Sequence, residues 1–269
     1  WINNSSFLNA WNGQHVWTVP YTGKYRIEAY GAAGGGGGYS WNSSSINRTG
    51  GYGAKMSGEF NLIGGEKIRI LVGQQGSTEY YYYHRPGGGG GGTFVLRSPY
   101  NTEASILLIA GGGGGGGQGN WGQNSNGGNA YTTTTHGNTG SYGNGGDRQS
   151  SWCCSGAGFF NNGSGHGGTV SYGYTNNMNS NTMKGGDSTQ SHATSSDGGF
   201  GGGGFGNLIP GGGGGFSGGD TTGSWAGSGM GYGGGSYNSG TNQNNSSTGV
   251  GPGGHNNGMH GYVIITQLL

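Results

Sequence analysis

The sequence predicts an all-β protein, a β-sandwich into which a large glycine-rich segment is inserted. Two observations lead to this expectation. Stretches that alternate apolar and polar residues occur in the first 110 residues and again at the C-terminus, and such alternation is typical of strands with one buried face. Glycine makes up 75 of the 269 residues, about four times its usual share, and glycine disfavours helices.

The first strands follow one another along the N-terminal part of the chain. Residues His15–Val19 alternate and stop at Pro20. From Lys24 to Tyr30 every second residue is apolar, which predicts a half-buried strand whose charged side chains share the other face.

A hairpin and two short strands complete the N-terminal set. The runs Lys55–Leu62 and Glu66–Val72 flank Gly64-Gly65, and this arrangement predicts a β-hairpin. The short apolar runs Thr93–Leu96 and Ile106–Ile109 add two strands.

The last strand, Tyr262–Thr266, has no predicted partner near it in the sequence. We therefore expect it to pair with the N-terminal strands. Residues 1–110 and 262–269 would then form one sandwich, and residues 111–261 would form an insertion within the same integrated unit.

The insertion consists of glycine runs separated by Asn, Ser, Thr and aromatic residues, the longest run being Gly111–Gly117. This composition is typical of flexible linkers or disorder. The ordered alternative is a bundle of polyglycine II helices, which have about three residues per turn and no internal hydrogen bonds, so that neighbouring helices must satisfy every N–H and C=O. We expect the bundle, because the sandwich supplies the conventional core on which it is anchored.

Composition and spacing argue against several classes of function. Charged residues are 7% of the chain, the net charge is +1 and no basic cluster occurs, so nucleic acid is not an expected partner. No apolar run approaches the roughly 18 residues of a membrane span. The histidines are scattered, the acidic residues form no close pair and no P-loop lysine follows a glycine run. We expect neither an enzyme nor a metal or cofactor site.

Several signals point to the extracellular space. Asn-X-Ser/Thr acceptors predict N-linked glycans, although some arise by chance in a chain rich in Asn and Ser. The acceptors are Asn3, Asn4, Asn42, Asn47, Asn162, Asn244 and Asn245.

The two cysteines, Cys153 and Cys154, are adjacent. Two reduced thiols, a vicinal disulfide and bonds to another chain are all open interpretations, and we favour a disulfide. Either kind of disulfide requires an oxidising compartment.

One aromatic run stands out from the polar loops as a candidate contact surface, because Tyr and Arg are enriched at interface hot spots. The alternative is a loop that packs on its own domain. The residues are Tyr80, Tyr81, Tyr82, Tyr83 and Arg85.

A set of segments carries a family resemblance when taken in order: Tyr25–Gly35, Ile70–Gly76, Gly87–Val95, Leu108–Gly115, Gly198–Gly204 and Gly211–Asp220. Together they resemble the extracellular glycine-rich domain of anaplastic lymphoma kinase and leukocyte tyrosine kinase. The resemblance implies a TNF-like, jelly-roll β-sandwich that carries a polyglycine-helix bundle, and in those receptors the domain binds a protein ligand.

Three functions are consistent with these observations. The first is a secreted structural glycoprotein whose copies assemble into a filament or surface coat, since low charge weakens repulsion between copies and a glycine bundle leaves outer edges that another copy can extend. The second is a receptor ectodomain that binds an extracellular protein. The third is an adhesin that binds a cell surface through loops between glycine helices. We favour the first.

Overall fold

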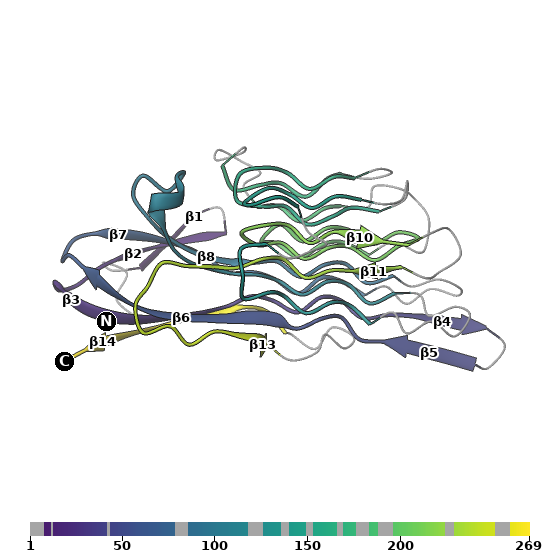
Figure 1. Ribbon diagram of the computed structural model, residues 1–269, viewed down its shortest axis with the longest axis horizontal. Helices are drawn as coiled ribbons and strands as arrows, with labels where there is room; N and C mark the ends of the chain where they lie inside the picture. Colours follow the sequence, from purple (N-terminus) through teal and green to yellow (C-terminus); the bar gives the residue numbers. More distant parts are fainter. Residues whose placement is uncertain are drawn as a thin grey trace.

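A computed structural model gives the arrangement of the chain (Figure 1). It describes residues 8–11, 13–41, 44–78, 86–117, 126–135, 140–148, 153–165, 169–175, 183–187, 196–223, 229–250 and 259–269. The described residues are almost entirely strands and extended segments, with a single 3₁₀ turn at Glu103–Ser105. The predicted all-β class is therefore confirmed.

Two antiparallel sheets form the conventional part of the protein, on the left of Figure 1. The six-stranded sheet has the order β1 (Leu8–Trp11), β2 (Gln14–Thr18), β7 (Lys67–Leu71), β8 (Thr93–Arg97), β9 (Ile106–Ala110) and β12 (Tyr237–Asn238). The four-stranded sheet has the order β13 (Ser246–Val250), β6 (Gly53–Leu62), β3 (Gly23–Tyr30) and β14 (Tyr262–Leu268).

The two remaining sheets of the described residues are small and have two strands each. They join β4 (Gly37–Trp41) to β5 (Ser44–Arg48), and β10 (Thr221–Thr222) to β11 (Met230–Gly231).

The inner faces of the two larger sheets contribute to one buried apolar cluster. Tyr25 and Ile27 of β3 are fully buried, as are Ile68 of β7 and Leu108 of β9. The alternation of apolar and polar residues in β3 therefore matches the alternation of buried and outward-facing side chains. The odd-numbered residues lie in the core and the even-numbered ones lie outside it.

The predicted hairpin at Gly64-Gly65 is wrong. A turn is present, and the N–H of Glu66 donates to the carbonyl of Ile63 (2.9 Å). However, β6 pairs with β3 and β13, whereas β7 pairs with β2 and β8, so the chain changes sheets at this turn. The physical reason is that the apolar faces of β6 and β7 both line the same core, and they bury each other by facing across it.

The C-terminal strand pairs with the N-terminal part as predicted. The register of β14 on β3 runs without a break from Tyr262 opposite Tyr30 to Leu268 opposite Lys24. The range 111–261, expected to lie outside the sandwich, also contributes to the sheets: β12 pairs with β9 and β13 pairs with β6. Backbone groups at the edges of both sheets gain partners in this way.

The glycine runs lie side by side on the right of Figure 1 and hydrogen-bond one another through their backbones. In the run Gly111–Gly117, the N–H groups of Gly113 and Gly116 donate to the carbonyls of Ala32 and Gly35, each at 2.9 Å. The same step of three residues links this run to further segments, since Gly112 and Gly115 donate to Gly214 and Gly211, and they accept from Gly234 and Gly231.

Aromatic side chains attach the glycine-rich part to the six-stranded sheet. Phe159, Tyr174 and Phe216 form a second buried cluster with apolar residues of β7, β8 and β9. The rings of Phe94 and Tyr174 stack at 5.8 Å between centroids. Side chains of the glycine-rich part thus pack against β7, β8 and β9 of the six-stranded sheet.

Candidate functional site

The outer face of the four-stranded sheet carries the clearest cluster of charged side chains among the described residues. The alternation of β3 places Lys24, Arg26 and Glu28 on this face. The register of β3 on β6 sets Arg26 opposite Glu59 and Tyr30 opposite Lys55. Directly opposed side chains on one face of a sheet lie close enough to interact.

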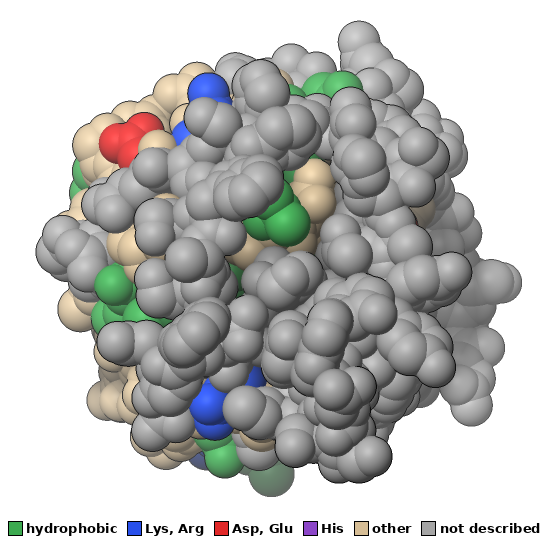
Figure 2. All heavy atoms as spheres, turned by 90° about the vertical axis from the view of Figure 1, so that its right-hand side faces the viewer, with side chains coloured by type: hydrophobic (Ala, Val, Ile, Leu, Met, Phe, Trp, Pro, Cys, Tyr) green, Lys and Arg blue, Asp and Glu red, His purple; other side chains and the backbone are tan. Residues whose placement is uncertain are grey.

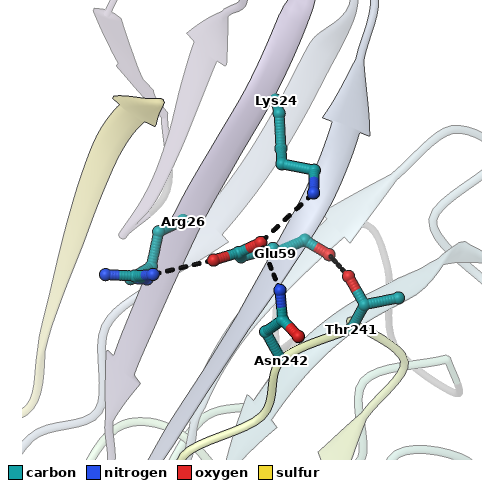
Figure 3. Close-up of polar contacts among 5 residues, drawn as sticks. All are labelled: Lys24, Arg26, Glu59, Thr241 and Asn242. Atoms are coloured by element: carbon teal, nitrogen blue, oxygen red, sulfur yellow. Dashed lines mark hydrogen bonds and ion pairs between the residues drawn. The ribbon is translucent and has the colours of Figure 1, made fainter. Parts of the chain in front are cut away.

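Glu59 is the centre of this cluster (Figure 3). Its carboxylate accepts hydrogen bonds from Arg26 Nη2 at 2.7 Å, Asn242 Nδ2 at 2.8 Å and Lys24 Nζ at 3.3 Å. The Glu59 side chain is only 7% exposed, whereas those of Lys24 and Arg26 are 49% and 48% exposed. The bonds from Arg26 and Asn242 lower the pKa of Glu59 to about 2, so this carboxylate stays ionised.

A segment distant in sequence holds Glu59 in place. Thr241 pairs with Glu59 in an isolated bridge, in which each backbone N–H donates to the other residue's carbonyl at 2.8 and 3.1 Å. Asn242 follows with a φ of 48°, a left-handed conformation that Asn tolerates better than most residues. The result is a rigid patch with one buried anion and two half-exposed cations, suited to receive a carboxylate or another acceptor from a partner.

An aromatic group adjoins the charged cluster. The rings of Tyr30 and Tyr262 stack with centroids 4.1 Å apart, and Lys55 Nζ lies 5.6 Å from the Tyr30 centroid. Lys55 also pairs with Glu28 at 3.0 Å, and this hydrogen bond raises the pKa of Lys55. Tyr262 and Ile264 remain 43% and 42% exposed, so the patch ends in apolar surface at β14.

Neither Glu59 nor Asn242 belongs to a motif that the sequence pattern marks as a site. The charged face of residues 24–30 was visible as a pattern, and it is half of the cluster. Asn242 lies 183 positions from Glu59, and no local signal connects the two.

The predicted glycan acceptors differ in how their side chains are used. Asn47 and Asn244 are exposed. By contrast, Asn245 Nδ2 donates to Gln243 at 3.1 Å and its Oδ1 accepts from two donors, so this amide is occupied. Asn162 Oδ1 accepts from the N–H of Gly173 at 2.8 Å. Asn3, Asn4 and Asn42 lie outside the described residues.

The predicted disulfide is absent in the structure, where Cys153 and Cys154 are both buried thiols. Their sulfur atoms have different partners: Cys153 Sγ lies 2.9 Å from Thr221 Oγ1, and Cys154 Sγ lies 3.3 Å from the carbonyl of Ser155. Burial raises the pKa of Cys154 to about 11. A bond to another chain would require accessible sulfur, which neither residue offers.

Three further predictions concern the tyrosine run, membrane-spanning segments and metal sites. The candidate contact residues Tyr80, Tyr81, Tyr82, Tyr83 and Arg85 all belong to the segment 79–85, outside the described residues. No described helix is long and apolar enough to cross a bilayer, and no three metal-binding side chains gather in the described ranges.

The end of the molecule opposite the termini shows only scattered charged side chains among its described residues (Figure 2).

Comparison with known proteins finds a match to one stretch of the chain. No model of a known protein family matches the chain. A stretch of 64 residues is 47% identical to the leukocyte tyrosine kinase receptor of Mus musculus, and this stretch is 24% of the chain and 6% of the receptor. The chain therefore matches only a small part of the receptor's length.

Proposed function

We propose that this chain is a ligand-binding extracellular module of the type found in the leukocyte tyrosine kinase receptor. The observation that carries the proposal is the local match to that receptor, 47% identical over 64 residues. The all-β architecture agrees with such a module. Neither the comparisons nor the structure supports a filament, a surface coat or an adhesin, so the receptor-like function takes precedence over the one that the sequence favoured.

The outer face of the four-stranded sheet is the proposed binding surface for a protein ligand. It combines half-exposed cations, Lys24 and Arg26, with the exposed ring of Tyr262. Arg and Tyr are among the residues that most often dominate binding energy at interfaces. The bonds to Glu59 order the cations before binding, which reduces the entropy lost when a ligand docks.

We further propose that the glycine runs are polyglycine II helices. Support comes from the three-residue step of their hydrogen bonds, since this is the repeat of a helix with about three residues per turn. An experimental structure tests the proposal through the backbone angles of Gly111–Gly117, expected near φ −75° and ψ +145°. Angles typical of a β-sheet would contradict it.

The module is proposed to be glycosylated and non-enzymatic. Asn47 and Asn244 are the best acceptors among the described ones because their side chains are exposed. Secretion from eukaryotic cells, followed by enzymatic removal of N-glycans, should lower the mass of the protein. The substitutions Asn47→Gln and Asn244→Gln should each remove part of this difference, and Asn245→Gln should remove none.

A binding screen tests the ligand-binding function. The secreted module, made multivalent by fusion to an antibody Fc segment, is applied to a panel of secreted proteins displayed on beads. We expect a hit whose signal falls at least tenfold in Arg26→Ala. Arg97→Ala is the matched control, because Arg97 also pairs with a glutamate, Glu66 at 3.0 Å, but belongs to β8 of the six-stranded sheet.

The controls separate folding from binding. Both variants must keep the circular dichroism spectrum and melting temperature of the parent within a few degrees. A folded module that binds no secreted protein would refute the proposed function. An equal loss of binding signal in Arg26→Ala and Arg97→Ala would refute the proposed location of the binding surface.

A further inference from the structure

Among the described residues, the strand β14 forms one edge of the four-stranded sheet. It is the last strand in the order β13-β6-β3-β14, and no described strand pairs with its other side. In an antiparallel edge strand, alternate residues turn their N–H and C=O groups away from the sheet. Such groups form a template on which another strand can add.

The other edges of the two larger sheets are protected by features that β14 lacks. Within the described residues, the edge strands β12 and β1 are short, with two and four residues. The edge strand β13 contains Gly249, and its register on β6 is irregular. Short length and bulges are the usual means of preventing edge pairing. β14 has seven residues, Tyr-Val-Ile-Ile-Thr-Gln-Leu, with no charge, glycine or proline.

Both faces of β14 are incompletely covered. Its inward-facing residues Val263 and Ile265 are only partly buried, although their partners on β3, Ala29 and Ile27, are fully buried. On the outer face Tyr262 and Ile264 are more than 40% exposed. A further strand at this edge would cover the remaining apolar surface on both faces.

We propose that this strand is supplied by a second copy of the chain, so that two β14 strands pair antiparallel across a two-fold axis. Full overlap of the seven residues places Ile265 on the axis. It sets Ile264 opposite Thr266 of the partner subunit, and Tyr262 opposite Leu268 of the partner subunit.

The charge pattern favours a second copy over a charged partner. None of these pairs contains a charge, so self-pairing creates no repulsion within the interface, and the net charge of +1 per chain keeps repulsion between whole copies weak. A two-fold contact closes on itself, so the product is a dimer and not a filament. A single strand pair buries less than the roughly 800 Å² per partner of a standard interface, so the dimer should depend on concentration in the micromolar range.

Sedimentation of the purified chain between about 1 and 200 µM tests the proposal. We expect the average mass to rise from one copy to two over this range. Ile264→Lys places a charge on the strand edge and should weaken dimerisation at least tenfold. Ile63→Lys is the matched control, because Ile63 is 67% exposed in the turn between β6 and β7 and should leave dimerisation unchanged. A wild-type chain that stays monomeric at the highest concentration, or equal behaviour of the two variants, would overturn the proposal.

Cysteine cross-linking tests the register. Directly opposed residues of antiparallel strands lie within the distance that a disulfide spans. Chains carrying Ile264→Cys, mixed with chains carrying Thr266→Cys, should form a disulfide-linked dimer faster than either variant alone. The native cysteines do not interfere, because both are buried. Equal rates for the mixture and the single variants would rule out this pairing. The readout is the mass of the protein alone, so it does not depend on the proposed ligand.

Discussion

Substituting a single methyl group into the glycine-rich part should destabilise the protein strongly. A Cβ atom at Gly113 would lie 2.1 Å from the carbonyl oxygen of Gly51, whereas real Cβ atoms stay at least 3.0 Å from such an atom. The backbone around Gly51 must therefore move by about 1 Å, since the contacting atoms are main chain and cannot rotate away.

That movement breaks hydrogen bonds. Gly51 donates to the carbonyl of Gly114 at 2.8 Å and accepts from Gly34 at 3.0 Å, and bonds lengthened by about 1 Å no longer qualify. Overpacking costs about 1–3 kcal/mol, and each buried group left without a partner costs about 1–3 kcal/mol. With one overpacking term and two unpaired groups of Gly51, we expect Gly113→Ala to lower the free energy of unfolding by about 3–9 kcal/mol.

Two further glycines make this a graded series. A Cβ at Gly92 would meet Gly215 Cα at 3.0 Å, so Gly92→Ala should have an intermediate effect. A Cβ at Gly23 would have no neighbour nearer than 3.6 Å, so Gly23→Ala should change stability by less than about 1 kcal/mol, towards stabilisation. Denaturant unfolding followed by tryptophan fluorescence measures all three. If Gly113→Ala loses less than about 1 kcal/mol, or if the order of the series is reversed, the close packing of these backbones is refuted.

Three other predictions concern titratable groups. Because the pKa of Glu59 is lowered to about 2, its ionised form stabilises the fold above about pH 4.5, and this contribution is lost as the pH falls towards 2. In Glu59→Gln, the melting temperature should therefore change less with pH over this range. Burial raises the pKa of Asp220 to about 6, so its contribution has the opposite sign and the fold gains stability as the pH falls from about 7 to 4. Asp220→Asn should therefore be more stable than the parent at pH 7.5 by about 1–3 kcal/mol and should lose this advantage below pH 4. Cys153 and Cys154 should not react with a thiol reagent in the native protein, and both should react after unfolding in denaturant.

Each of these has a contrary outcome. A parallel shift of the Glu59→Gln profile at all pH values would mean that the carboxylate titrates normally. An Asp220→Asn variant that is less stable at pH 7.5 would mean that the ionised form is well solvated or paired. A single reactive thiol in the native protein would show that one cysteine is accessible.

Local patterns in the sequence account for much of the sandwich. The period of two in residues 24–30 gave both the strand and its buried face, because strand geometry alone fixes that relation. The pairing of the C-terminal strand was inferred from the absence of a nearby partner, and the register on β3 confirms it. The turn at Gly64-Gly65 was also found, but whether its strands pair side by side or face each other across a core is not a local property.

The composition by itself predicted a chain with little helix, because glycine disfavours helices, and it left the glycine runs either disordered or hydrogen-bonded to one another. Only the tertiary structure decided which run lies beside which. Gly113 has Gly51 and Ala32 as neighbours. The glycine runs are chemically alike, so their sequences do not specify which run pairs with which. The Glu59 cluster and the edge position of β14 are likewise decided by the tertiary structure. Each depends on how segments that are distant in sequence are arranged once the sheets have assembled.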